Sequence, residues 1–154
     1  MEQQKILIDN QQKKRIPTDI IRKKTRQILN ALGFEDQEIS IVLTDDEAIQ
    51  ALNRQYRKLD RPTNVLAFPM QEGDFADITP GLLGDLVVSC ETAQREADKA
   101  GITLEERMSQ LLVHGTLHLA GFDHETGEDD ARSMEEKSLE ILRQVEDNPD
   151  LDAF

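Results

Sequence analysis

The chain has 154 residues, the length of one domain, and a chain of this length can bury a core without disulfides or a second module. Its formal net charge of −13 argues against tight binding to bare nucleic acid, because Lys and Arg supply most of that affinity. No apolar run reaches the roughly 18 residues of a membrane span, and residues 1–10 lack the features of a secretory signal. The single cysteine, Cys90, excludes an internal disulfide. We therefore expect one cytoplasmic domain over residues 1–154, with no membrane partner.

The acidic charge is concentrated in the second half of the chain. Residues 1–62 carry 12 Lys and Arg against 10 Asp and Glu, whereas residues 63–154 carry 6 against 21. A contact with RNA would therefore use the first half or a local patch. Two basic clusters there, at residues 13–15 and 22–24, are interpreted as the solvated start and the solvated face of a helix.

The first elements in chain order are predicted to be a strand, a helix and a strand. Residues 5–9 and 39–43 alternate or are rich in β-branched side chains, which favours strands. Between them, apolar residues recur at helical spacing from Pro17 to Gly33, and Gly33 is expected to end the helix.

A second helix is predicted over residues 46–58, with Thr44 or Asp45 as its N-terminal cap. Residues 65–68 are expected to form a third strand, closed by Pro69. In the predicted helix over residues 46–58, the residues expected to be buried recur at helical spacing: Ala48, Ile49, Leu52 and Tyr56.

A fourth strand is predicted over residues 84–90, where it ends at the core residue Cys90. A polar helix over residues 91–100 follows. Thr103 and Glu106 have the spacing of a capping box for the next helix, which extends to about Ala120.

A last, acidic amphipathic helix is predicted over about residues 129–145, and residues 148–154 are expected to be a frayed tail. The elements do not alternate strictly as βαβ units. They predict an α+β domain in which a small four-stranded mixed sheet is packed with about five helices.

All three histidines of the chain, His114, His118 and His124, fall within eleven residues. On a helix, His114 and His118 would lie on one face, where both imidazoles can reach one ion. Gly121 stands where a positive φ can end the helix, which would let the chain turn back and bring His124 to the same ion. Three imidazoles with an open fourth position are typical of catalytic zinc. We therefore expect one Zn²⁺ per chain, on this helix and the loop after it.

The histidine spacing matches the metalloprotease motif H-E-x-x-H-x-x-G-x-x-H, with one difference. Gly115 stands where those enzymes carry the glutamate that serves as general base. Asp123, beside the third histidine, has two open interpretations, as an acceptor for an imidazole N–H or as a turn residue. The structural alternative for the cluster is a pair of core histidines and a surface histidine.

Four cations precede the third predicted strand in this acidic protein: Arg54, Arg57, Lys58 and Arg61. The planar arginine side chain suits phosphate oxygens, so one of these residues could hold a phosphodiester against the metal. The dipole of a helix C-terminus, which favours cations, explains Arg57 and Lys58 equally well. Both interpretations stay open.

Three blocks of the chain form distinct motifs: HGTLHLAGFDH at residues 114–124, LNRQYRKLDRPTNVLAFP at 52–69 and LGDLVV at 83–88. The first is similar to the signature H-G-x-L-H-L-x-G-Y-D-H, and the second is similar to L-N-x-x-Y-R-x-x-D-x-P-T-[DN]-V-L-S-F-P. Together the three blocks resemble the YbeY family of bacterial endoribonucleases, and the resemblance covers about residues 40 to 140. Two positions depart from it: Ala67 replaces Ser and Phe122 replaces Tyr, which removes two hydroxyls near the site.

The resemblance implies a zinc-dependent, single-strand-specific endoribonuclease in which His114, His118 and His124 bind the metal. It implies that Arg57 lies at the phosphate-binding cleft. The implied role is ribosomal RNA processing, notably maturation of the 3′ end of 16S rRNA, together with ribosome quality control. The implied partners are ribosomal RNA and the small ribosomal subunit, with ribosomal protein S11 and the GTPase Era.

In the leading hypothesis the ion polarises a phosphodiester and activates water, and Arg57 stabilises negative charge on the phosphorane. One alternative is a metzincin-like metallopeptidase, favoured by the spacing and opposed by Gly115. The other is a ribosome assembly factor with structural zinc, whose acidic surface meets basic ribosomal proteins.

Overall fold

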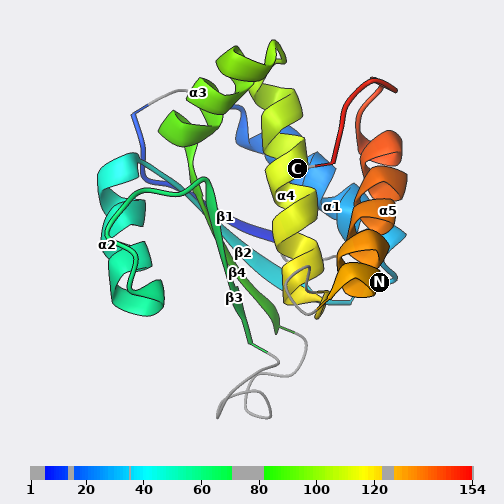
Figure 1. The fold of residues 1–154 in the computed structure, drawn as a ribbon, viewed down its shortest axis with the longest axis horizontal. Helices are drawn as coiled ribbons and strands as arrows, with labels where there is room; N and C mark the ends of the chain where they lie inside the picture. The colour runs from blue at the N-terminus through cyan, green and yellow to red at the C-terminus, as the bar shows by residue number, and fades with distance from the viewer. Residues whose placement is uncertain (1–5, 14–15, 35, 71–81, 123–126, 154) are drawn as a thin grey trace.

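Four strands form one sheet in the computed structural model, which describes residues 6–13, 16–34, 36–70, 82–122 and 127–153 (Figure 1). They are β1 (Ile6–Asn10), β2 (Glu38–Thr44), β3 (Val65–Pro69) and β4 (Leu82–Ser89). Their order across the sheet is β1-β2-β4-β3. β1, β2 and β4 are parallel, whereas β3 runs antiparallel to β4 at the edge. The sheet is therefore mixed, as predicted.

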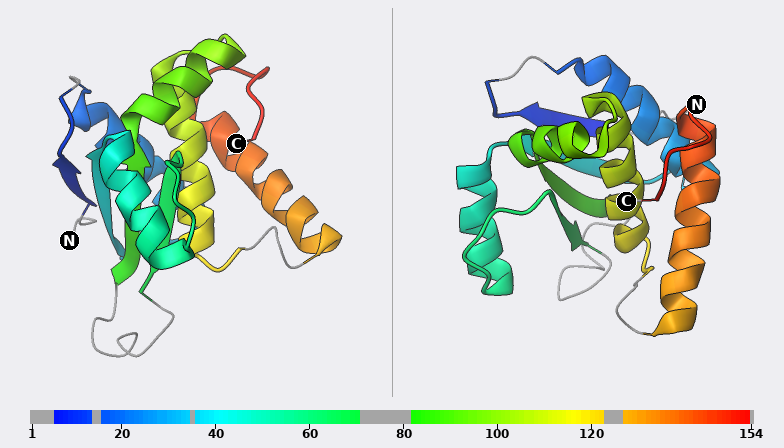
Figure 2. Two further views of the ribbon diagram at one scale, coloured as in Figure 1. Left: turned by 60° about the vertical axis from the view of Figure 1, so that its left-hand side comes forward. Right: turned by 45° about the horizontal axis from the view of Figure 1, so that its top comes forward.

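Five helices in the described residues pack around this sheet (Figure 2). They are α1 (Thr18–Ala31), α2 (Asp46–Arg57), α3 (Cys90–Ala100), α4 (Leu104–Leu119) and α5 (Glu128–Val145). α1, α4 and α5 lie on one side of the sheet, α2 lies on the other, and α3 lies at one end of the strands. This arrangement confirms the predicted α+β fold. In the part of the chain that the structure describes, no helix has the length and apolar character needed to cross a membrane.

The alternation of side chains along the strands divides the apolar residues into two clusters. Leu86 and Val88 of β4 belong to the main core with α1, α4 and α5, whereas Val87 belongs to a smaller cluster under α2. β3 contributes to both, since Val65 packs against the main core and Leu66 lies in the smaller cluster. The edge strand β3 therefore separates α2 from α4.

Side-chain caps set the start of three helices. The Asp45 carboxylate accepts a hydrogen bond from the backbone N–H of Ala48 at 2.9 Å, so Asp45 caps α2. Thr103 and Glu106 form the predicted capping box of α4, with both bonds at 3.0 Å. Cys90 is buried as expected, but it begins α3 and does not end a strand, because Ser89 caps that helix.

The buried stripe predicted for α2 is wrong at two of its four positions. Ile49 is buried and Leu52 is partly buried, but Ala48 and Tyr56 are exposed. Asn53 is fully buried instead, and its Nδ2 donates to the backbone oxygen of Arg61 at 2.9 Å. The inward face of α2 therefore turns toward the loop that follows the helix.

The solvated helix face predicted at residues 22–24 is wrong at Lys24. The Lys24 side chain is buried between α1, α4 and the end of α5, where Nζ donates to Ser109 Oγ at 2.8 Å and pairs with Glu146. Burial lowers the pKa of Lys24, although the negative charges of Glu105 and Glu106 act to raise it. In the other basic cluster Lys13 is exposed, and residues 14–15 lie outside the described residues.

The predicted frayed tail is also wrong for the residues that the structure describes. Leu151 is only 5% exposed. Asn148 Nδ2 donates to Glu106 Oε2 at 2.6 Å, and Gln110 Nε2 donates to the backbone oxygen of Asp152 at 2.7 Å. The tail therefore returns to α4, which lies far from it in sequence.

Candidate metal centre

His114 and His118 lie one turn apart on α4, and their rings meet edge to face. The two Nε2 atoms are 3.1 Å apart, and the ring centroids are 4.6 Å apart at an interplanar angle of 73°. Two ligands bound at 2.0–2.1 Å and at the tetrahedral angle lie about 3.3 Å apart. The two Nε2 atoms could therefore bind the same ion, and two imidazoles are a donor set that suits zinc.

Gly121 has a positive φ just after the end of α4, as predicted. Its φ is 98°, and its N–H donates to the backbone oxygen of His118 at 3.0 Å. Phe122 N–H donates to Leu117 O at 3.0 Å, and its side chain packs against the main core. The predicted third ligand, His124, lies outside the described residues, as does Asp123. The structure thus brings together the two predicted ligands that it describes.

Gly115 explains why α4 lies so close to the sheet. A Cβ atom at this position would lie 2.7 Å from Leu86 Cδ2 and 3.4 Å from Val65 Cγ2. A glutamate there would require the fully buried Leu86 side chain to shift. This packing weighs against the metallopeptidase alternative.

A second glycine allows the end of α4 to approach the sheet. Gly84 of β4 has a φ of 150°, and a Cβ there would lie 2.5 Å from Phe68 O and 2.8 Å from Leu119 Cδ2. The histidine pair is therefore carried by a helix that rests directly on β3 and β4.

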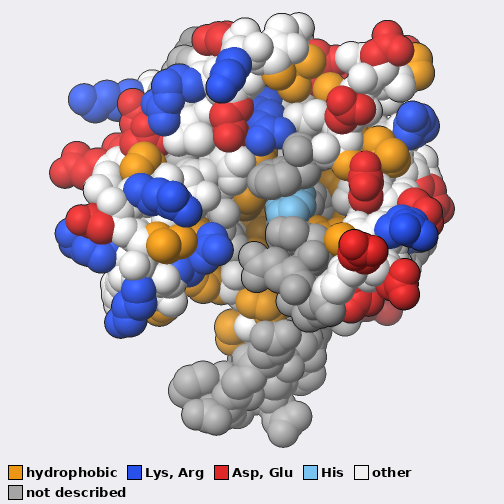
Figure 3. Space-filling view, in the orientation of Figure 1, with side chains coloured by type: hydrophobic (Ala, Val, Ile, Leu, Met, Phe, Trp, Pro, Cys, Tyr) orange, Lys and Arg blue, Asp and Glu red, His pale blue; other side chains and the backbone are white. Residues whose placement is uncertain are grey.

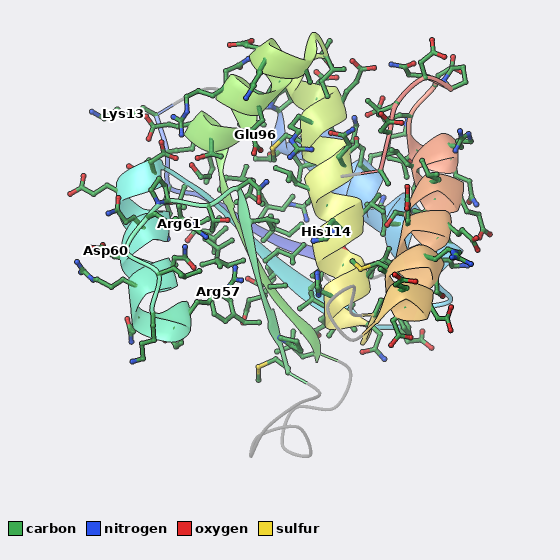
Figure 4. The ribbon with its side chains drawn as sticks, viewed as in Figure 1. Lys13, Arg57, Asp60, Arg61, Glu96 and His114 are labelled. Atoms are coloured by element: carbon green, nitrogen blue, oxygen red, sulfur yellow. The ribbon has the colours of Figure 1, made fainter. Side chains whose placement is uncertain are left out.

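Arg57 is the last residue of α2 and is exposed. In Figure 4 it lies at the end of α2, with the strands between it and His114 on α4. Arg57 therefore belongs to the α2 side of the site, whereas the histidines belong to the α4 side.

Asn53 holds the loop that follows Arg57, a role that the sequence analysis missed. Besides its side-chain bond to Arg61, its backbone oxygen accepts a hydrogen bond from Leu59 N–H at 3.3 Å. Lys58 takes the left-handed conformation, with a φ of 61°, which ends the helix. The available signal was an asparagine four residues after Ile49, on the inward face of the helix.

A hydrogen-bond network fixes the start of β3. Asn64 Oδ1 accepts from Val65 N–H at 2.7 Å, and its Nδ2 donates to Glu96 Oε1 at 3.1 Å. Glu96 Oε1 also accepts from Arg107 Nη2 at 3.0 Å. The network therefore ties β3 to α3 and α4, which sets the strand relative to the histidine helix.

The two departures from the family pattern are both packing positions. Ala67 on β3 pairs with Leu86 on β4, and Ala67 and Phe122 are each partly buried against the main core. An apolar side chain at either position therefore has apolar neighbours.

The surface around the histidines is divided by charge. The space-filling view shows a histidine side chain in a central hollow (Figure 3). Lys and Arg side chains gather over α2 on one side of the hollow, and Asp and Glu side chains predominate over α5 on the other. The acidic protein therefore presents a basic surface next to the histidines.

The fold and the histidine pair place the chain among α+β proteins with a candidate metal centre on one helix. The family model described as Endoribonuclease YbeY matches residues 7–146. The chain belongs to the endoribonuclease YbeY family.

Several proteins named Endoribonuclease YbeY are similar to the chain over most of their length. The protein from Geobacter sulfurreducens is 50% identical over 144 residues, which cover 92% of this chain and 96% of the relative. The protein from Aquifex aeolicus is 41% identical over 133 residues, which cover 86% and 87%. A solution structure of a protein from Thermotoga maritima shares the fold, with a TM-score of 0.64 at 27% identity over 91% of this chain and 88% of that chain.

Proposed function

We propose that this chain is a zinc-dependent, single-strand-specific endoribonuclease that acts in ribosomal RNA processing, including maturation of the 3′ end of 16S rRNA, and in ribosome quality control. The observation that carries the proposal is the pair of Nε2 atoms, 3.1 Å apart on α4, in a member of a family whose relatives are named endoribonucleases. The proposed partners are ribosomal RNA and the small ribosomal subunit, with ribosomal protein S11 and the GTPase Era, in the cytoplasm.

The proposed ligands are His114, His118 and His124, which would hold one Zn²⁺ per chain. Bound zinc supplies a Lewis acid and lowers the pKa of a coordinated water to about 7. The contribution of His114 and His118 would be to present their Nε2 atoms to the ion from adjacent turns of a helix that is fixed against the sheet. The main core is large, and His114 and His118 are only partly buried beside it, which supports a catalytic over a structural role for the metal.

Arg57 is the proposed electrophilic residue. Its guanidinium would donate two parallel hydrogen bonds to the phosphate and offset the negative charge that develops on the phosphorane. Asn53 acts through Arg57 and its loop, since it bonds to the backbone at Leu59 and Arg61 and so positions the end of α2. Asn53 is therefore a positioning residue.

The charge distribution supports entry of RNA on the α2 side of the histidines. The net charge of −13 opposes tight binding to arbitrary RNA, so the ribosome is expected to supply much of the docking. We expect weak, salt-sensitive binding of bare RNA by the isolated protein.

The test is to purify the protein without a histidine tag, measure its zinc content, and assay cleavage of a 16S-type precursor RNA. We expect about one zinc per chain, and cleavage that is lost in His114→Ala/His118→Ala and reduced about 100-fold or more in Arg57→Ala. Arg132→Ala, which removes an exposed arginine from α5, is the matched control and should cleave normally. Bound zinc without histidine-dependent cleavage would overturn the proposal in favour of an assembly factor.

A further inference from the structure

Tyr56 is a large exposed side chain on α2, next to Arg57 in the sequence. Two large hydrophobic residues are exposed in the described part of the chain, Leu7 and Tyr56, each at 59%. Tyr56 lies on the last turn of α2 and meets Phe68 of β3 edge to face, with centroids 5.2 Å apart at 69°. Phe68 packs against the small cluster under α2. Phe68 thus contacts the Tyr56 ring on its protein-facing side, while more than half of the Tyr56 surface is exposed to solvent.

The neighbours of Tyr56 in the sequence are cationic and exposed. Arg54, Arg57, Lys58 and Arg61 surround it, with Asp60 as the one carboxylate among residues 54–61. Arg54 pairs with Asp60 at 3.7 Å, a contact between two exposed side chains that water and salt weaken. In an acidic protein, this segment combines an exposed aromatic ring with several positive charges. Proteins that bind single-stranded nucleic acid use this combination, in which aromatic rings stack on bases and cations follow the backbone.

The ring and the histidines lie on the two sides of one edge strand. On β3, Phe68 faces α2 and contacts Tyr56, whereas Val65 faces α4 and lies under Gly115, next to His114. β3 is the outermost strand of the described sheet on that side. A polynucleotide that crosses the open edge of β3 would therefore contact the α2 surface and the histidine helix in turn.

We propose that Tyr56, supported by Phe68, is a subsite that stacks on an unpaired nucleobase of the RNA substrate. This inference rests on the proposed ribonuclease function and adds a physical source for its preference for single strands. Bases in a duplex are stacked on each other and present no free face, whereas an unpaired base can leave its neighbours and stack on an aromatic side chain. Stacking involves the face of any base, so the subsite selects unpaired over paired RNA without reading sequence.

The composition of the protein provides a direct probe of this subsite. Tyr56 is the only tyrosine of the chain, which has no tryptophan, so the tyrosine fluorescence of the protein comes from this side chain alone. The protein would be titrated at low salt with a single-stranded 2′-O-methyl oligonucleotide and with an abasic oligonucleotide of the same length and charge. We expect the base-bearing strand to quench the fluorescence and the abasic strand to leave it unchanged.

Binding of the same labelled oligonucleotide, followed by fluorescence anisotropy, tests the energetic role of the ring. Tyr56→Ala should weaken binding by about 5- to 100-fold, and Tyr56→Phe should retain binding because the ring remains. Leu7→Ala removes an equally exposed side chain from β1, the strand at the opposite edge of the sheet, and should bind like the wild type. Melting temperatures would verify that the exposed substitutions leave the fold intact.

The possible outcomes separate this inference from the proposed function. Equal quenching by the abasic strand, or wild-type affinity in Tyr56→Ala, would overturn the stacking subsite and show that the ring only covers Phe68. Histidine-dependent cleavage in the same protein would leave the proposed nuclease function in place. Absence of both RNA binding and cleavage would overturn the inference and the proposed function together.

Discussion

Gly115 and Leu86 meet where α4 lies closest to the sheet, and this contact provides a prediction about packing. A methyl group at residue 115 would lie 2.7 Å from Leu86 Cδ2. We expect Gly115→Ala to lower the free energy of unfolding by about 1–3 kcal/mol, the usual effect of overfilling a packed core. Urea denaturation followed by circular dichroism would measure it.

The double variant Gly115→Ala/Leu86→Ala is the control for this contact. Leu86→Ala alone creates a cavity, which the added methyl group at residue 115 would partly fill. The double variant should therefore be more stable than the sum of the two single effects predicts. Strict additivity would show that the two residues do not compete for the same space.

Asp46 joins the starts of α2 and α3 and provides a prediction about pH. Its carboxylate accepts hydrogen bonds from Ser89 Oγ at 2.6 Å and Thr92 Oγ1 at 2.5 Å, and it pairs with Arg95 Nη1 at 2.7 Å. Burial alone would raise the pKa of Asp46, but these three partners outweigh it and lower the pKa below its ordinary value. The ionised carboxylate is therefore favoured by folding.

Since an unfolded aspartate has a pKa of about 3.9, the contribution of Asp46 is fully present above that pH and is lost as the pH falls through the lower, folded pKa. Asp46→Asn should be less stable by about 1–3 kcal/mol near neutral pH, and the difference should disappear in acid. Asp36→Asn, at an exposed aspartate before β2, is the control. A difference that persists undiminished in strong acid would contradict this account.

At the level of elements, the buried Lys24 links three helices and provides a further prediction. It contacts Ser109 on α4 and Glu146 just after α5, and Ser109 Oγ also donates to Glu146 Oε1 at 2.6 Å. Lys24→Ala leaves the Glu146 charge largely buried without its ammonium partner. We expect a loss of about 3–5 kcal/mol in the free energy of unfolding.

Lys23→Ala removes the neighbouring exposed lysine and should change stability by less than about 0.5 kcal/mol. Lys24→Met/Glu146→Leu should recover much of the loss, because it removes both charges together. Equal unfolding midpoints for Lys23→Ala and Lys24→Ala would show that the buried pair contributes no net stability.

Features that depend on local chemistry were the ones that the sequence could predict. The capping box at Thr103 and the positive φ of Gly121 follow from residues a few positions apart, and so does the shared face of His114 and His118. The roles of Lys24 and Asn53 depend on partners brought together by the tertiary fold. Nothing in the sequence near Lys24 indicates that Glu146 lies beside it.

Tyr56 shows the same limit within the candidate site. Its position in the helical pattern of α2 predicted burial. The helix instead turns Asn53 inward to hold the following loop, and Tyr56 is left exposed against Phe68. Periodicity identifies an apolar face of a helix, whereas the extent of its burial depends on how far the neighbouring sheet reaches.

For the molecule as a whole, the tail after α5 is part of the folded core and provides a prediction about stability. Leu151 belongs to the main core cluster together with residues of β1, β2, α1 and α4, which lie far from it in sequence. Leu151→Ala should lower the free energy of unfolding by about 2–3 kcal/mol. Asp150→Ala, at the exposed position beside it, should have little effect. Identical denaturation curves for these two variants would mean that the tail does not contribute in solution.

The position of β3 at the edge of the sheet has a consequence for hydrogen exchange. The strand is paired on one side only in the described sheet, from Val65 opposite Val88 to Pro69 opposite Gly84. Its amides should therefore exchange with deuterium faster than those of β2 and β4, which are paired on both sides. RNA bound across this edge would contact α2 and α4 together and should slow exchange in β3, whereas β1, the opposite edge of the same sheet, should keep its rate. Slower exchange in β3 would therefore indicate that RNA contacts the α2 side and the α4 side of the site at the same time.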